Sequence, residues 1–278
     1  MIGRLLDGLL SDPRPGAVED LDIVVVCNGC TDDTVRIASE RAPAVRVVEI
    51  PEPSKHLALR TGDQYARGFP RVYVDADVVL AAADIHALVG VLMSADGILA
   101  AAPERELPLG GSAWPVRAYY RVWQRLPAVR QGLFGRGVIA VTEAGYARIA
   151  ALPPLMADDL VASLAFGPAE RRVVDTARVV VQPPRTWGDL IRRRIRAATS
   201  TAQVEQHQRE AGGQDGVGAP SARTGKADLG ALLRTQPSLF PAVLVFLTVA
   251  LAARRGARKA IRQGDFGTWL RDESSRQA

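Results

Sequence analysis

Short apolar runs alternate with helical patterns over the first 80 residues, and this alternation constrains the fold more than any other feature. Leu21–Cys27 is rich in β-branched residues and suits a strand buried on both faces. Val45–Ile50 and Arg71–Leu80 indicate two further strands. A helix capped by Thr31 and a second helix over Leu57–Arg67 separate the three strands. Strands that alternate with helices imply crossover connections and a largely parallel sheet, so we predict an α/β fold.

Length and composition fit this class and exclude others. The 278 residues, 47% of them apolar, suffice for one large α/β domain with an appendage, and they exclude a disordered chain. The net charge of +5 comes without a nucleic-acid recognition motif or interleaved aromatic residues. We therefore expect no nucleic-acid partner.

Acidic side chains follow a strand at the place where α/β sheets bind ligands. Asp75-Ala76-Asp77 comes directly after the alternating Val72-Tyr73-Val74 run, and such sheets bind ligands beyond the carboxyl ends of their strands. Carboxylates suit hard cations such as Mg²⁺ or Mn²⁺, which in turn bind phosphate oxygens. The pair alone is also explained by two solvated loop acids.

The surrounding motifs carry a family resemblance. The string NGCTDDT at 28–34 follows the first strand, and KHLALRTG at 55–62 precedes the acidic pair. Their order resembles the inverting family 2 glycosyltransferases, which carry an N/D-G-S/C-T-D-D-T turn, then K-x-x-A-L-N-x-G, then Y/F-x-D-A-D. The resemblance spans roughly residues 2–200. It implies a GT-A fold, which is Rossmann-like with a mostly parallel sheet and flanking helices.

The resemblance also implies roles for the matched residues. The family transfers a sugar from a nucleotide-sugar donor to a hydroxyl with inversion, as a metal-assisted, hexosyltransferase-type reaction. In this chain Asp77 would be the main ligand of Mg²⁺ or Mn²⁺, and Asp75 would contact the metal or the ribose. Asn28 and Lys55 would help to hold the nucleotide.

Two further segments match in the second half of the resemblance. PLMADDL at 154–160 is similar to the E-D-x-x-L segment of the family, which gives Asp159 the role of general base and puts Asp158 in the Glu position. The two acids are otherwise explained as the start of a helix. RRRIR at 192–196 stands where the family carries a basic Q-x-x-R-W segment, so Arg196 would contact the diphosphate unless it lies on a solvated helix face. The missing Trp argues against a processive polysaccharide synthase.

Two departures from the family pattern affect the beginning of the chain. The family starts with a strand and a P-x-x-N-E loop that touches the nucleotide base, whereas Met1–Leu6 resembles the helix that comes after them. We expect the lack of that strand to leave Leu21–Cys27 with an unpaired edge and to weaken nucleotide binding. Cys27 replaces an acid of the nucleotide-contacting turn. With Cys30 it forms a C-x-x-C, but a small buried hydrophobe explains Cys27 better than a redox role does, and we expect a reducing compartment.

The end of the chain predicts a separate helical segment. Residues 205–228 are polar and Gly-rich, typical of a linker, and divide a domain at 1–204 from a hydrophobic and basic segment at 229–278. Leu239–Ala253 is apolar apart from one Thr and is followed by five Lys or Arg residues. It fits a short tilted membrane span, an interfacial helix, or a helix packed on the domain or a partner.

These observations lead to one functional hypothesis and two alternatives. We expect a glycosyltransferase on the cytoplasmic, inner face of the cell membrane, acting on a glycan or lipid-linked acceptor of the cell envelope. A nucleotidyltransferase would also use acidic metal sites, but it should show a Gly-rich, basic N-terminal loop. A non-catalytic GT-A-like module that associates with a membrane as a partner is the other alternative.

Overall fold

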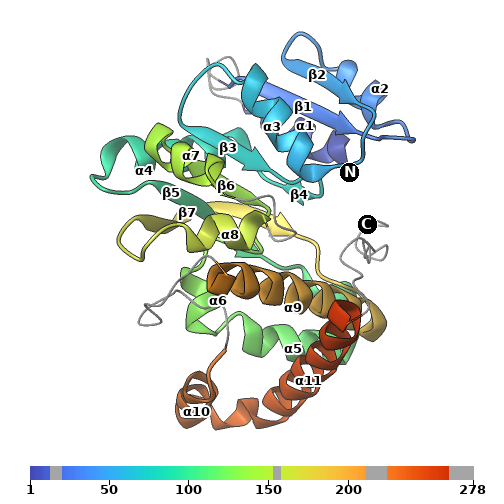
Figure 1. The fold of residues 1–278 in the computed structure, drawn as a ribbon, viewed down its shortest axis with the longest axis vertical. Helices are drawn as coiled ribbons and strands as arrows, with labels where there is room; N and C mark the ends of the chain where they lie inside the picture. The colour runs from blue at the N-terminus through green and yellow to red at the C-terminus, as the bar shows by residue number, and fades with distance from the viewer. Residues whose placement is uncertain (13–20, 153–157, 211–223, 263–278) are drawn as a thin grey trace. The chain divides into compact units, whose positions relative to one another are not determined.

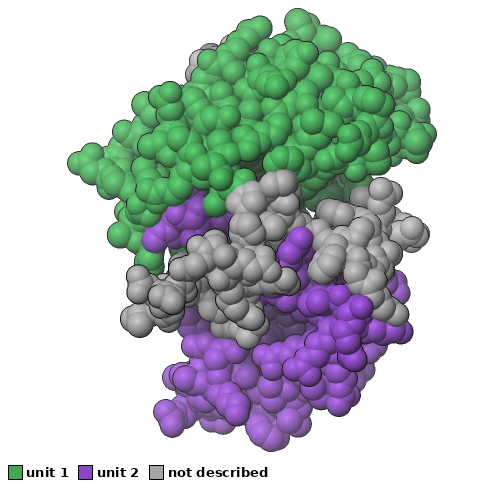
Figure 2. All heavy atoms as spheres, in the orientation of Figure 1, with its two compact units in different colours: residues 1–106, 136–152, 168–181 green, residues 107–135, 153–167, 182–278 purple. Residues whose placement is uncertain are grey.

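The computed structural model describes residues 1–12, 21–152, 158–210 and 224–262. The chain divides into two compact units, each assembled from three stretches of sequence (Figure 2). The first unit comprises Met1–Glu106, Arg136–Leu152 and Pro168–Val181. The second comprises Leu107–Gly135, Pro153–Gly167 and Gln182–Ala278. Because the units interleave in sequence, neither corresponds to one of the predicted domains, and the predicted boundaries at 204 and 228 stay a prediction.

The described residues of the first unit form two β-sheets (Figure 1). In the smaller sheet, β1 (Ile23–Asn28) pairs in parallel with β2 (Val45–Ile50). The larger sheet has the order β3-β6-β5-β7-β4. Its strands are β3 (Arg71–Val74), β4 (Val78–Val79), β5 (Ala100–Glu106), β6 (Val138–Val141) and β7 (Arg171–Val181). The predicted α/β class is confirmed.

Strand direction differs across the larger sheet. β5 and β7 run in parallel, whereas β6 is antiparallel to β3 and β5, and β4 is antiparallel to β7. Among the described residues β1 pairs with β2 alone.

Helices flank both sheets of this unit. They are α1 (Ile2–Leu10), α2 (Thr34–Ser39), α3 (Lys55–Tyr65), α4 (Ala82–Ser94) and α7 (Glu143–Ala150). The buried positions of α1 follow helical spacing: Ile2, Leu5, Leu6 and Leu9. Gly8 lets α1 approach the sheet, because a Cβ there would lie 2.7 Å from the carbonyl oxygen of Leu80. The second predicted helix begins two residues earlier than expected, since the Ser54 hydroxyl caps it by accepting from the Leu57 N–H at 3.2 Å.

The second unit is helical where the structure describes it. Its α-helices are α5 (Trp114–Trp123), α6 (Pro127–Gln131), α8 (Asp158–Leu164), α9 (Trp187–Glu210), α10 (Lys226–Thr235) and α11 (Phe240–Arg262). The α9 helix continues to Glu210 and α10 begins at Lys226, so both ends of the predicted linker are helical; residues 211–223 lie outside the described residues.

The core of the second unit joins α5, α9 and α11 (Figure 1). The ring of Tyr119 stacks on that of Phe246, with centroids 5.2 Å apart. Gly256 brings α11 close to α9, because a Cβ there would lie 2.5 Å from the Ile195 Cδ1 atom. The C-terminal apolar helix is therefore packed on one side by its own unit.

Candidate functional site

The acidic pair lies in a turn that interrupts the predicted strand Arg71–Leu80. β3 ends at Val74 and β4 begins at Val78, so Asp75 and Asp77 occupy the connection between them. The Asp75 N–H donates to the carbonyl oxygen of Gly137 at 2.7 Å, which fixes the backbone where the strand ends. The Asp75 side chain is 40% exposed, and Asp77 is an exposed residue. The turn thus presents two carboxylates at the end of β3.

Gly137, which directly precedes the neighbouring strand β6, makes this turn possible. Its φ of +66° lies in the left-handed region, where residues with a side chain are strained. A Cβ at this position would lie 2.5 Å from Val78 Cγ1 and 3.4 Å from Asp75 Oδ2. Only glycine allows the backbone to approach the acidic turn this closely.

Lys55 meets the acidic turn from the beginning of α3. Its Nζ atom lies 2.9 Å from Asp75 Oδ1, and the two side chains are 42% and 40% exposed. The cap by Ser54 fixes where α3 begins and hence where Lys55 projects. The structure therefore brings two of the predicted site residues together within the first unit.

The turn after β1 contains the predicted nucleotide contact Asn28. β1 ends at this residue, and the next residue, Gly29, has a φ of +59°. The Gly29 N–H donates to the Ile50 carbonyl at 2.9 Å, and a Cβ there would lie 2.9 Å from Pro53 Cβ. The structure thus explains why the NGCTDDT string has a glycine at position 29: the turn passes close to the segment that leads to α3, and a side chain would not fit.

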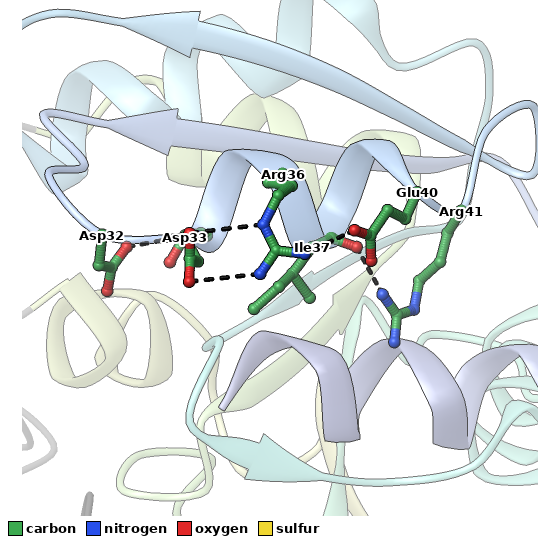
Figure 3. A network of polar contacts seen from close by, with 7 residues as sticks. Asp32, Asp33, Arg36, Ile37, Glu40 and Arg41 are labelled. Carbon is green, nitrogen blue, oxygen red and sulfur yellow. Dashed lines mark hydrogen bonds and ion pairs between the residues drawn. The ribbon is translucent and has the colours of Figure 1, made fainter.

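The two acids of this string make local contacts (Figure 3). Asp32 Oδ1 accepts from the Thr34 N–H at 3.1 Å, and hydrogen bonds from Thr34 hold the pKa of Asp32 below its usual value. Asp33 pairs with Arg36 at 3.3 Å, and Arg36 also pairs with Glu40 at 2.6 Å. These exposed contacts stabilise the start of α2 and account for both acids without a ligand.

The two cysteines differ in environment. Cys27 is buried, as predicted, and Cys30 is exposed; both are free thiols. Burial, with a smaller contribution from Cys30, raises the pKa of Cys27 to about 11. A thiol that keeps its proton is a poor nucleophile, so the structure favours packing over reactivity at Cys27.

Asp159 belongs to the second unit and lies in the first turn of α8. Its Oδ2 atom accepts from the Gly135 N–H at 2.7 Å, and its Oδ1 atom accepts from the Leu160 N–H at 2.8 Å. Asp159 is an exposed residue. Residues 154–157 of the matching motif lie outside the described residues. The Asp159 carboxylate therefore holds the backbone at Gly135, and this structural contact is independent of any catalytic role.

The basic segment 192–196 lies on α9, and most of its arginines have structural contacts. Arg192 pairs with Asp189, Arg193 donates to the Gln182 carbonyl at 3.0 Å, and the Arg194 guanidinium lies 5.8 Å from the centroid of the Tyr119 ring. Arg196 is half-buried on the same helix. The predicted diphosphate contact thus lies in the second unit, in a helix anchored to its core.

Sequence reasoning missed one buried cation beside the acidic turn. Arg136 is fully buried, donates to the Pro103 carbonyl at 2.8 Å and lies 3.7 Å from the Glu104 carboxylate. Burial lowers the pKa of Arg136 to about 10. It directly precedes Gly137, so it ties β5 to the segment that holds the Asp75 backbone. In the sequence, only the string Gly-Arg-Gly at 135–137 hinted at a special role for this arginine.

The donor set at the acidic turn fits a hard divalent cation held jointly with a ligand. No cluster of three or more His, Cys, Asp or Glu side chains suited to a metal occurs in the described part of the chain. Mg²⁺ is commonly bound through one or two carboxylates together with substrate phosphates. Asp75 and Asp77 supply two carboxylates, and Lys55 adds a positive charge for an anionic ligand.

The comparisons with known proteins concern the family and the fold. The model of the family described as glycosyl transferase family 2 matches residues 1–147. The structure is similar to a mannosyltransferase, PcManGT from Pyrobaculum calidifontis, solved with GDP-Man and Mn²⁺, with 21% identity and a TM-score of 0.57 over 95% of this chain and 75% of that chain. The sequence matches none of the curated proteins.

A second group of solved structures aligns over a smaller part of the chain. Glucosyl-3-phosphoglycerate synthase from Mycobacterium tuberculosis, solved with Mn²⁺, UDP-Glc and phosphoglyceric acid, has 20% identity and a TM-score of 0.44. The alignment covers 64% of this chain and 65% of that chain, so this chain spans just under two thirds of the synthase.

Proposed function

Since this chain belongs to glycosyl transferase family 2, we propose that it transfers a sugar from a nucleotide-sugar donor to an acceptor hydroxyl with inversion at the anomeric carbon. The observation that carries the proposal is the contact between Lys55 and Asp75 beside Asp77, at the carboxyl end of β3. A cation and two carboxylates at a sheet edge suit a metal-bound diphosphate.

The first unit would bind the donor. Asn28 ends β1 and Lys55 begins α3, and both would contact the nucleotide part of the donor. The Lys55 ammonium is a point charge on a flexible stem, which suits phosphate oxygens. Asp75 would contact the ribose or the metal.

Asp77 and Asp75 would hold Mg²⁺ or Mn²⁺, and PcManGT was solved with Mn²⁺. A bound divalent cation stabilises the negative charge that accumulates on a departing diphosphate. In the first unit, the Lys55 ammonium would add positive charge toward the phosphates; in the second unit, Arg196 would serve as the diphosphate contact that the family resemblance implies. The Gly137 carbonyl keeps the Asp75 backbone in place.

Asp159 would act as the general base. A sugar hydroxyl is a weak nucleophile, and a carboxylate within hydrogen-bond reach takes its proton as the new bond forms. The acceptor oxygen attacks the anomeric carbon, the bond from that carbon to the diphosphate oxygen breaks, and the nucleoside diphosphate leaves. The Gly135 N–H would orient the carboxylate for this role.

The acceptor would be a glycan or a lipid-linked glycan of the cell envelope, and the enzyme would work on the cytoplasmic face of the membrane. One described helical stretch, Pro237–Arg262, is long and apolar enough to cross a membrane, and a third of its most apolar window is buried inside the protein. This segment supports membrane contact, because it combines apolar and basic residues.

A panel experiment tests the function. The full chain is incubated with nucleotide sugars, Mn²⁺, and glycan or lipid-linked acceptors, and nucleoside diphosphate release and the anomeric configuration of the product are measured. Release that depends on one donor, with inversion, supports the proposal. Pyrophosphate release from a nucleoside triphosphate would instead indicate a nucleotidyltransferase, and binding without release a non-catalytic module.

A further inference from the structure

The exposed face of α11 carries an unusual apolar stripe. Phe240, Leu244, Leu247 and Leu251 are 46–56% exposed. Their spacing of four, three and four residues places them on one face of the helix. Four large apolar side chains in a row on a protein surface mark an interaction site more often than scattered ones do.

The same face becomes cationic along the helix. Arg254 and Arg258 continue the helical spacing of the stripe, three and seven residues after Leu251. Five exposed cations lie in this part of α11: Arg254, Arg255, Arg258, Lys259 and Arg262. Residues 229–262 contain neither Asp nor Glu. One surface therefore combines exposed hydrocarbon with positive charge, and no acidic residue within 229–262 offsets that charge.

The opposite face of α11 is buried in its own unit. Val249 is fully buried, and Phe246 stacks on Tyr119. Ile195 of α9 packs against Gly256. A membrane-spanning helix would have to give up these contacts to be surrounded by lipid, so the packing favours a helix that meets a membrane from one side.

We propose that the exposed face of α11 docks on the surface of an anionic bilayer. The stripe from Phe240 to Leu251 enters the boundary between headgroups and acyl chains, and Arg254, Arg255 and Arg258 contact lipid phosphates. The proposal deepens, and rests on, the membrane association proposed above, by naming the surface, the orientation and the lipid charge.

The dimensions of the stripe support this occupant. The eleven residue steps from Phe240 to Leu251 rise about 17 Å along the helix, whereas the hydrocarbon core is about 30 Å thick. The stripe is thus too short to span the core. A second copy of the chain fits less well: a parallel pair would bring the cations together, and an antiparallel pair would set them against leucines. A bilayer offers hydrocarbon and phosphate side by side.

Vesicle binding of the full chain tests the proposal. Co-sedimentation is measured with vesicles of phosphatidylcholine alone and with vesicles enriched in phosphatidylglycerol, without donor or acceptor. Leu244→Gln with Leu247→Gln should lower the partition coefficient on the order of tenfold, because two half-exposed side chains lose their transfer energy. Arg254→Gln, Arg255→Gln and Arg258→Gln together should lower binding to anionic vesicles on the order of fivefold for each charge removed.

Matched controls separate this surface from general effects. Met93→Gln removes an exposed apolar side chain of α4, and Arg67→Gln with Arg172→Gln and Arg178→Gln removes the same charge from the first unit. Both controls should bind like the parent chain, and the melting temperature checks that every variant folds. Alkaline carbonate should release the bound chain, since a spanning helix would resist it.

Three results would overturn the proposal: no binding of the parent chain to anionic vesicles, resistance to carbonate, or equal loss in the controls. A dimer that the leucine double variant dissociates, without vesicle binding, would assign the stripe to a second copy instead. Vesicle binding does not require sugar transfer. A negative donor panel would therefore not contradict the vesicle result, and a lack of vesicle binding would not contradict sugar transfer.

Discussion

Lys55 and Asp75 form an ion pair of 2.9 Å between the first residue of α3 and the turn after β3. The two residues lie 20 positions apart in the sequence, and both side chains keep about two fifths of their surface exposed. An exposed pair contributes only about 0–1 kcal/mol to stability. Its main consequence is to hold a cation and a carboxylate together at the turn where we propose that a diphosphate binds.

We expect Lys55→Met to weaken binding of the nucleoside diphosphate while changing the melting temperature little. The side chain keeps its length but loses the charge that would attract phosphate oxygens. Calorimetry with the diphosphate in Mn²⁺ measures the effect. Arg46→Met, at another exposed ion pair of the first unit, is the control; equal losses in both variants would argue against a direct role for Lys55.

We expect Asp159→Asn to lower transfer about 10²–10⁴-fold, the usual contribution of a general base. An amide oxygen can still accept from the Gly135 N–H, so fold and donor binding should survive. Asp159→Ala should lose this hydrogen bond as well and melt at a lower temperature. If Asp158→Asn greatly lowers the rate of transfer and Asp159→Asn lowers it little, the general base is Asp158 and our assignment is wrong by one residue.

Gly137→Ala should destabilise the chain by about 1–3 kcal/mol, because it combines a positive φ with a close approach to Val78. It should also weaken diphosphate binding, since the Gly137 carbonyl holds Asp75. Denaturant unfolding measures the first effect. Gly68→Ala is the control, because nothing lies within 4 Å of a Cβ there; equal stability of the two variants would contradict the described turn.

Cys27 should make stability fall with rising pH above about 9. Its pKa rises from 9.0 to about 11 on folding, chiefly because the thiol is buried. Between these values the unfolded chain has released the proton and the folded chain still binds it, so the free energy of unfolding decreases as pH increases.

The comparison of Cys27→Ala with the parent chain over this pH range isolates the contribution. The variant should show a shallower decrease in melting temperature. Mild alkylation at neutral pH should modify the exposed Cys30 and spare Cys27. Identical pH slopes, or rapid alkylation of Cys27, would show that the thiol is not buried as described.

The sequence sufficed for features that depend on local pattern. The β-branched run before Asn28 is a local pattern, so β1 could be placed from it; the second helix was predicted too, but two residues late, because the Ser54 cap was not recognised. The strand end before Asp75 could be anticipated, because the acidic pair follows the alternating Val72–Val74 run, but nothing in the sequence indicated that Val78–Val79 forms a separate strand, and the prediction placed both in one strand at 71–80.

Long-range contacts could not be predicted in this way. The Gly137 carbonyl meets Asp75 across 62 positions, and buried Arg136 meets Pro103 across 33. Neither contact has a local signature beyond two flanking glycines. The interleaving of the two units has the same cause, since segments distant in sequence decide which helices share a core.

The most direct measurement of the central claim is diphosphate release by the parent chain and by Asp77→Ala, each in Mn²⁺ and in EDTA. We predict donor-dependent release by the parent chain in Mn²⁺, and loss of that release in EDTA or in the variant, with an unchanged melting temperature. Full release in EDTA, or by Asp77→Ala, would contradict a metal-assisted transfer at the turn between β3 and β4.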